Sequence, residues 1–86
     1  MSEPQEDRLK RLRMRSWRRG TKEMDMILGP YSDTELAALG AADLDLYDQM
    51  LHENDQDLYQ WVSGQQREPG IYAPVLNRVR AYLQRR

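Results

Sequence analysis

The sequence predicts an all-α protein, a single compact domain of about five short helices. Apolar residues recur three and four positions apart in several segments, which is the spacing of one face of a helix. No segment shows the alternation of apolar and polar residues that marks a strand. With 86 residues, 40% of them apolar, the chain is long enough for one modest hydrophobic core.

A first helix is predicted over about 8–17, where Leu9 and Leu12 follow helical spacing. Arginine side chains should cover much of its surface. The acidic residues 1–7 are expected to be a disordered segment that precedes a helical domain of residues 8–86.

A second and a third helix are predicted on either side of Gly29-Pro30. The apolar stripe of the second helix consists of Met24, Ile27, Leu28 and Tyr31. We expect this helix to stop at Gly29-Pro30, because proline cannot continue a helix. The next segment, Ser-Asp-Thr-Glu at 32–35, fits a capping box and predicts the start of a third helix that carries Leu36 and Leu39.

Two further helical regions are predicted in the second half of the chain. The first runs over about 42–62, and good cap residues at 54–57 predict a break within it, with Gly64 as the C-terminal cap. Its apolar stripe consists of Leu44, Tyr47, Leu51, Leu58, Trp61 and Val62. The last helix is expected over about 74–85.

Charge is divided sharply along the chain. Residues 8–22 contain eight Lys or Arg and no acid, whereas residues 23–66 contain ten Asp or Glu and no Lys or Arg. The formal net charge of −1 therefore hides a strong charge dipole. The absence of cysteine excludes disulfides, thiolate metal sites and a cysteine nucleophile.

The sequence also bears on location. No run approaches the roughly 20 apolar residues needed to span a bilayer, so we expect no membrane insertion. The acidic N-terminus lacks the apolar core of a secretory signal and the basic character of a transit peptide. We expect a cytoplasmic bacterial protein, with a processed organellar protein as the alternative.

Arg19, Gly20 and Glu23 mark the boundary between the basic and acidic segments, and we interpret them as the centre of a docking surface. The planar fork of an arginine recognises carboxylates with fixed geometry, and a glycine lets another backbone approach closely. We expect Arg19 and Glu23 to be exposed for this purpose. The neighbouring residues assigned to the same partner-binding surface are Arg15, Trp17 and Arg18.

The simpler interpretation of Arg19 and Glu23 is an ordinary ion pair between residues four apart on a helix. Three features weigh against it. Arginine on the N-terminal side of glutamate is the weaker orientation, a cation near the start of a helix opposes the helix dipole, and Gly20 costs about 1 kcal/mol inside a helix. A site with three locally unfavourable features indicates that its residues bind an external partner.

The basic segment 8–22 also permits another function class, a small nucleic-acid-binding or antitoxin-type protein. Its arginines can line one side of a helix, as phosphate binding requires. The pI of about 5.8 opposes this function, because an acidic body repels a polyanion. Trp17 is the only aromatic residue in the segment, so no stacking platform is evident. An acidic protein partner fits better, and we expect no nucleic acid.

Neither a catalytic nor a metal site is predicted. His52 is the only histidine, and with Asp48 it offers at most a weak pair of ligands. The acidic residues within 43–57 lack the spacing and turn glycine of a calcium loop and are expected to form a solvated face. The sequence contains no nucleophile–base pair and no glycine-rich phosphate loop, so we expect a protein that is not an enzyme.

Two motifs together resemble the succinate dehydrogenase flavinylation factor family, also called succinate dehydrogenase assembly factor 2. The first has the order Arg-Ser-Trp-Arg-Arg-Gly-x-x-Glu-x-Asp-x-x-Leu over residues 15–28. The second is Asp-x-Asp-Leu-Tyr-x-Trp over residues 55–61, followed by Gly64. The resemblance covers about residues 8–84, and the distance between the motifs in so short a chain makes it specific.

The resemblance implies a five-helix chaperone that binds the flavoprotein subunit of succinate dehydrogenase, and often that of fumarate reductase, during assembly of respiratory complex II. Such a factor promotes covalent attachment of FAD to a histidine of that subunit and binds no cofactor stably itself. The resemblance places Arg19, Gly20 and Glu23 at the contact near the flavin. Thr21 and Met14 depart from the family pattern, which bears on fine specificity for the partner. We expect a monomer.

Overall fold

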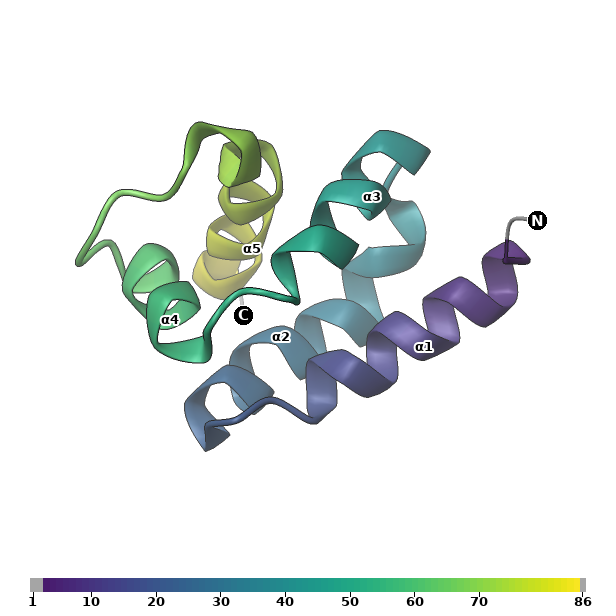
Figure 1. Ribbon diagram of the computed structural model, residues 1–86, viewed down its shortest axis with the longest axis horizontal. Helices are drawn as coiled ribbons and strands as arrows, with labels where there is room; N and C mark the ends of the chain where they lie inside the picture. Colours follow the sequence, from purple (N-terminus) through teal and green to yellow (C-terminus); the bar gives the residue numbers. More distant parts are fainter. Residues whose placement is uncertain (1–2, 86) are drawn as a thin grey trace.

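The computed structural model describes residues 3–85, and every regular element in that range is helical, as predicted (Figure 1). The elements are α1 (Gln5–Trp17), α2 (Lys22–Glu35), η1 (Leu36–Ala38), α3 (Ala41–Met50), α4 (Asp55–Ser63), η2 (Gly70–Tyr72) and α5 (Ala73–Arg85). The two η elements are single 3-10 turns. None of the described helices is long and apolar enough to span a membrane.

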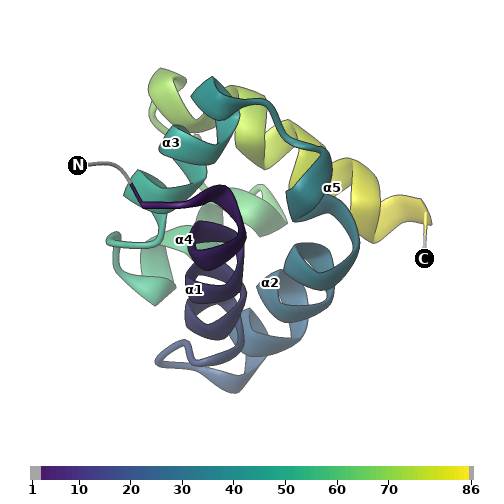
Figure 2. The same ribbon diagram turned by 90° about the vertical axis from the view of Figure 1, so that its right-hand side faces the viewer.

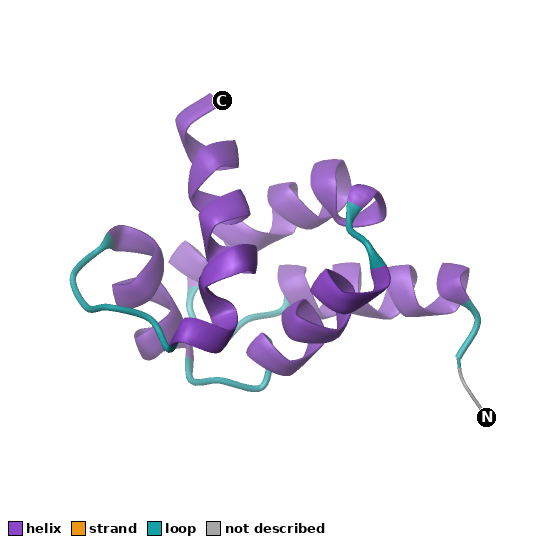
Figure 3. Ribbon diagram, turned by 90° about the horizontal axis from the view of Figure 1, so that it is seen from above, coloured by secondary structure: helices purple, strands orange, loops and turns teal. Residues whose placement is uncertain are grey.

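α1 and α2 form an antiparallel hairpin along one side of the molecule (Figure 1). After a quarter turn, α3 and α5 are seen packed over this hairpin (Figure 2), and α5 contacts α2, α3 and α4. The connections are short except for the loop between α4 and η2 (Figure 3). This arrangement brings the loop between α1 and α2 to the same end of the molecule as the start of α4.

α1 begins at Gln5, three residues before the start expected from the sequence. Glu6 and Asp7 occupy its first turn, where negative side chains interact favourably with the helix dipole. Residues 5–7 therefore belong to the helix and not to a disordered segment. Residues 1–2 lie outside the described range.

α2 continues through Gly29-Pro30, where the sequence predicted a stop. A proline inside a helix removes one backbone hydrogen bond and costs about 3 kcal/mol. Continuation of the chain in this direction buries Tyr31 and Leu36 completely, and full burial of such a side chain contributes about 1.5–3 kcal/mol. Packing of the core thus offsets the local cost of the proline.

The prediction of a third helix that begins with a capping box at 32–35 is wrong. Residues 32–35 form the end of α2, and Leu36–Ala38 form only a 3-10 turn. The buried hydroxyl of Ser32 does not cap a new helix but donates to the carbonyl oxygen of Gly29 at 2.7 Å. Serine makes this backward hydrogen bond when it lies inside a helix.

The break predicted in the fourth helical region is confirmed. α3 ends at Met50 and α4 begins at Asp55, with Asn54 as the N-cap. The side chain of Asn54 accepts a hydrogen bond from the backbone N–H of Gln56 at 2.8 Å. α4 ends at Ser63, and its C-cap is Gly64, whose φ of 83° lies in the left-handed region that favours glycine.

The core is one apolar cluster with residues from all five α-helices. Its buried members are Leu12, Met24, Leu28, Tyr31, Leu36, Leu39, Leu44, Tyr47, Met50, Leu51, Leu58, Trp61, Val62, Tyr72, Val75, Leu76 and Val79. All six residues of the stripe predicted over 42–62 belong to this cluster. The hydroxyl groups of Tyr47 and Ser16 form a buried hydrogen bond of 2.6 Å, which ties α3 to α1.

Candidate functional site

The loop between α1 and α2, residues 18–21, is held in place by carboxylates from two helices. The backbone N–H of Arg19 donates to Oδ1 of Asp25 in α2 at 2.5 Å. The backbone N–H of Gly20 donates to Oδ2 of Asp55, the first residue of α4. The path of this loop is therefore fixed by side chains and not by regular structure.

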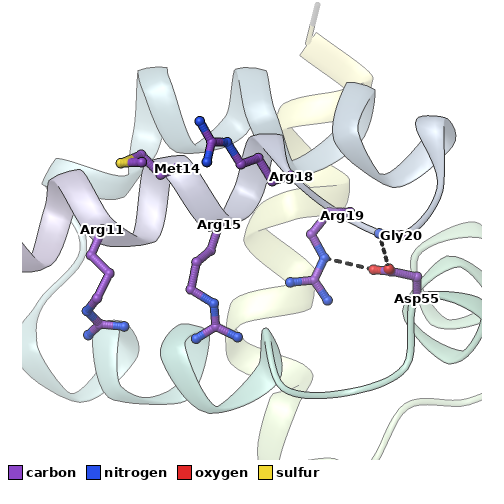
Figure 4. Close-up of a pocket in the computed structure, with 7 residues that line it drawn as sticks. All are labelled: Arg11, Met14, Arg15, Arg18, Arg19, Gly20 and Asp55. Carbon is purple, nitrogen blue, oxygen red and sulfur yellow. Dashed lines mark hydrogen bonds and ion pairs between the residues drawn. The ribbon is translucent and has the colours of Figure 1, made fainter.

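Arg19 is mostly buried, contrary to the expectation that it is exposed. Its side chain is 8% exposed, and its Nε donates to Oδ1 of Asp55 at 2.7 Å (Figure 4). Its Nη2 donates to the backbone carbonyl of Glu53 at 3.3 Å. Arg19 precedes α2, whereas Glu23 lies in the first turn of α2, so the two residues do not form the helical ion pair either. Arg19 instead links the loop to α4.

Gly20 lies against a neighbour within the chain, the side chain of Asp55. A Cβ atom at this position would lie 2.7 Å from Oδ2 of Asp55, which is too close for an unstrained contact. From the sequence, we expected the backbone of a partner to occupy this space. Gly20 is exposed all the same, so its other side remains open to a partner.

Three arginines of α1 are paired with acidic residues of α3. Arg8 binds Asp45 at 2.6 Å, and Arg11 binds Asp48 at 2.9 Å. Arg15 lies 3.6 Å from Asp48. The hydrogen bond from Arg11 holds the pKa of Asp48 below its usual range. The basic and acidic segments of the sequence therefore neutralise each other across the α1–α3 contact.

This pairing corrects two expectations from charge. The acidic residues within 43–57 are not simply a solvated face, since several of them bind arginines of α1. Four arginines of segment 8–22 (Arg8, Arg11, Arg15 and Arg19) are paired within the chain, so nucleic-acid binding is not favoured. Among residues 3–85 no group of three or more His, Cys, Asp or Glu side chains is arranged to hold a metal ion.

Two clefts flank the link between Arg19 and Asp55, and the larger one is cationic. It has a volume of about 480 Å³. Its lining residues are Arg11, Met14, Arg15, Arg18, Arg19, Gly20 and Asp55 (Figure 4). Arg11 and Arg15 point to one side of α1 and Arg18 points to the other. The exposed side chain of Arg18 makes no hydrogen bond or ion pair within residues 3–85, so its charge is available.

The smaller cleft, of about 340 Å³, lies on the acidic side of the same link. It is lined by Thr21, Glu23, Asp55, Gln56, Tyr59, Gln60 and Gln65. Glu23 is exposed and finds no cation in the described part of the chain. We call the two clefts together with the Arg19–Asp55 link the bipolar surface, because Arg18 offers a free cation on one side and Glu23 a free anion on the other.

Trp17 supports the hairpin and leaves part of its ring exposed. The indole packs on Gly29 of α2, where a Cβ atom would lie only about 2.5 Å from Cε3 of the ring. Its Nε1 donates to Oδ2 of Asp33 at 3.1 Å. Since 44% of Trp17 stays exposed, the residue can both brace the loop that follows it and contact a partner.

The structure therefore brings the predicted site residues together at one end of the hairpin but adds two that were not assigned to it. Asp25 and Asp55 hold the loop, and both occur in the motifs that carried the family resemblance. Asp55 was interpreted as part of a solvated acidic run. No local signal distinguishes it from Asp57, because its partners lie about 36 positions away.

Comparison with known proteins bears on this site. The family described as "Flavinator of succinate dehydrogenase" matches residues 10–83. Succinate dehydrogenase assembly factor 2, mitochondrial, of Mycosarcoma maydis is 34% identical over 76 residues, which cover 88% of this chain and 32% of the relative. The Meyerozyma guilliermondii protein of the same name is 38% identical over 61 residues, covering 71% of this chain and 45% of the relative.

A similar relative occurs in an animal. Succinate dehydrogenase assembly factor 2-B, mitochondrial, of Drosophila mojavensis is 35% identical over 72 residues, which cover 81% of this chain and 46% of the relative. The chain thus spans about a third to a half of the length of these curated relatives. All three are named as mitochondrial proteins, so the cytoplasmic bacterial location expected from the sequence is not confirmed.

Proposed function

The chain belongs to the family of the flavinator of succinate dehydrogenase, and we propose that it is an assembly factor that binds the flavoprotein subunit of succinate dehydrogenase and promotes covalent attachment of FAD to that subunit. The family match over most of the chain and the names of its relatives support this function. The flavoprotein subunit of fumarate reductase belongs to the same proposal as a second partner.

The observation that carries the proposal is the bipolar surface. Arg8, Arg11 and Arg15 of α1 are paired with acidic residues of α3. Arg18 and Glu23, in contrast, are exposed and unpaired within residues 3–85. Arg18 lines the larger cleft and Glu23 lines the smaller one, and the loop between α1 and α2 is fixed by internal hydrogen bonds. A flavoprotein that presents a carboxylate to one cleft and a cation to the other would be held in one orientation, because complementary charges set the register of an interface.

Such binding can promote flavinylation without a catalytic group on this chain. The reaction joins a histidine of the flavoprotein to the flavin, and it needs those groups to be aligned. A small protein that binds the aligned conformation more tightly than the others increases its population. Correct alignment can remove several kcal/mol from a barrier. In this proposal the chemistry belongs to the flavin and its host subunit, and the chain holds no FAD of its own.

Arg18 and Glu23 also provide the cleanest test of docking. Removing Arg19 would leave the carboxylate of Asp55 without its partner in a site where both side chains are at most 15% exposed, which costs about 3–5 kcal/mol of stability. A loss of activity on mutation of Arg19 would therefore mix unfolding with loss of docking. Arg18 and Glu23 have no partner to lose among residues 3–85.

We propose to measure binding of the purified chain to each flavoprotein subunit by isothermal titration calorimetry. Arg18→Ala and Glu23→Ala should each weaken binding by roughly tenfold, because each removes a charge from the interface. Matched exposed charges outside the bipolar surface, tested as Arg67→Ala and Glu6→Ala, should change binding less than twofold. The proposal fails if wild type does not bind, or if the surface variants bind as tightly as these controls.

A further inference from the structure

Asp55 joins the docking loop to α4 through both oxygens of its carboxylate. Oδ1 accepts a hydrogen bond from Nε of Arg19, and Oδ2 accepts one from the backbone N–H of Gly20 (Figure 4). The side chain of Asp55 is 15% exposed. A carboxylate held at both oxygens by the same loop fixes the position and the direction of that loop relative to α4.

The contact with Asp55 uses only part of the hydrogen-bonding capacity of Arg19. A guanidinium carries five N–H groups. In Arg19, Nε binds Asp55 and Nη2 binds the carbonyl of Glu53, while Nη1 has no hydrogen bond to any residue in the described chain. Arg19 lines the cationic cleft, and its side chain is 8% exposed. An acceptor of hydrogen bonds in that cleft can bind the guanidinium from the side that Asp55 leaves open.

We propose that Asp55 is a positioning residue for docking of the flavoprotein subunit. It holds Arg19 and the backbone at Gly20 so that the free N–H groups of the guanidinium are presented to a carboxylate of the partner. This inference rests on the function proposed above. It also accounts for the glycine, because the carboxylate of Asp55 occupies the space that a Cβ atom at Gly20 would need.

A purely structural role of Asp55 can be separated from this one with a control on the same helix. Asp55 and Asp57 both lie in the first turn of α4, so either one interacts favourably with the helix dipole. Asp57 is exposed and has no side-chain partner within residues 3–85. Asp55→Asn and Asp57→Asn thus remove the same charge from the same turn, but only the first disturbs the loop.

Binding of the flavoprotein subunit should follow this difference. We expect Asp55→Asn to raise the Kd by roughly tenfold or more, since a charge-assisted hydrogen bond that orients Arg19 is lost, and Asp57→Asn to change it less than twofold. In a chain that already carries Arg19→Ala, and whose circular dichroism spectrum shows it to be folded, Asp55→Asn should add little, because it acts mainly through Arg19. The Gly20 amide resonance should shift in Asp55→Asn and stay in place in Asp57→Asn.

A second substitution covers the case in which Asp55→Asn does not fold. Asp55→Glu keeps the charge but lengthens the side chain, although the backbone of Gly20 already lies within hydrogen-bond distance of the Asp55 carboxylate. If position matters and not charge alone, this variant should keep the wild-type circular dichroism spectrum and still bind the flavoprotein more weakly.

The inference is overturned if Asp55→Asn shifts the Gly20 amide but binds like wild type. It is also overturned if Asp55→Asn weakens binding as much in the Arg19→Ala background as in wild type, since Asp55 would then act by another route. The proposed function fails separately, when wild type does not bind or when Arg18→Ala and Glu23→Ala have no effect. If those two variants weaken binding and Asp55→Asn does not, only the role of Asp55 is wrong.

Discussion

Gly29→Ala should destabilise this protein, although the same change stabilises most helices. Glycine inside a helix is less favourable than alanine by about 1 kcal/mol, so the local expectation is a gain in stability. Gly29 lies within α2 and faces the indole of Trp17. A Cβ atom there would lie 2.5 Å from Cε3 and 2.6 Å from Cε2 of the ring. Both atoms belong to a rigid ring, so the whole indole must move away.

The size of the effect follows from the burial of Trp17. The residue is 44% exposed, so somewhat more than half of its surface is in contact with the protein. A fully buried aromatic side chain removes roughly 150–250 Å² from water, so displacement of a half-buried indole exposes about 100 Å², which is worth about 2.5 kcal/mol. Subtraction of the gain in helix propensity, about 1 kcal/mol, leaves a net loss of roughly 1–2 kcal/mol.

Urea denaturation followed by far-ultraviolet circular dichroism measures this loss directly. A double-mutant cycle with Trp17→Ala isolates its cause. Once the indole is absent, Gly29→Ala should stabilise the chain by about 0.5–1 kcal/mol, so the sign of the effect should reverse. A Gly29→Ala protein that is as stable as wild type, or an effect that does not depend on Trp17, would refute this reasoning.

Two further predictions concern the core and the charged contact between α1 and α3. Leu51 and Leu58 are 2% and 0% exposed, so Leu→Ala at either position should lower the free energy of unfolding by about 2–5 kcal/mol, and unchanged denaturation midpoints would contradict the packing described. The hydrogen bond from Arg11 lowers the pKa of Asp48, so the stability that this group contributes is complete above its unfolded pKa of about 3.9 and is lost as the pH falls further. Asp48→Asn should therefore be less stable than wild type at pH 7 and approach it below about pH 4, whereas a deficit independent of pH would argue against the ion pair.

Much of the fold could be predicted because its signals are local. The N-cap at Asn54, the left-handed glycine at Gly64 and the apolar stripe between them depend on residues within a few positions of one another. The prediction was wrong at positions where a residue far away in the sequence determines the local structure. Position 29 has no room for a Cβ atom because the indole of Trp17 packs against it. α2 continues through Pro30 because the residues that follow enter the core.

The candidate site shows the same division. The position of the loop between α1 and α2 at the boundary of the basic and acidic segments, and the exposure of Glu23, agree with the prediction. The burial of Arg19 was not predicted, because its partner Asp55 lies 36 positions further along the chain. The charge segments could be counted in the sequence. Their neutralisation across α1 and α3 depends on how the helices pack.

Covalent FAD on the flavoprotein subunit is the most direct measure of the central claim, that this chain promotes flavinylation through its bipolar surface. The purified subunit is incubated with FAD, with or without the chain, then denatured and examined for flavin fluorescence in the gel. Wild type and Glu6→Ala should both increase the fluorescent band, and Glu23→Ala should increase it much less while keeping the same circular dichroism spectrum. Equal fluorescence with and without the wild-type chain would contradict the claim.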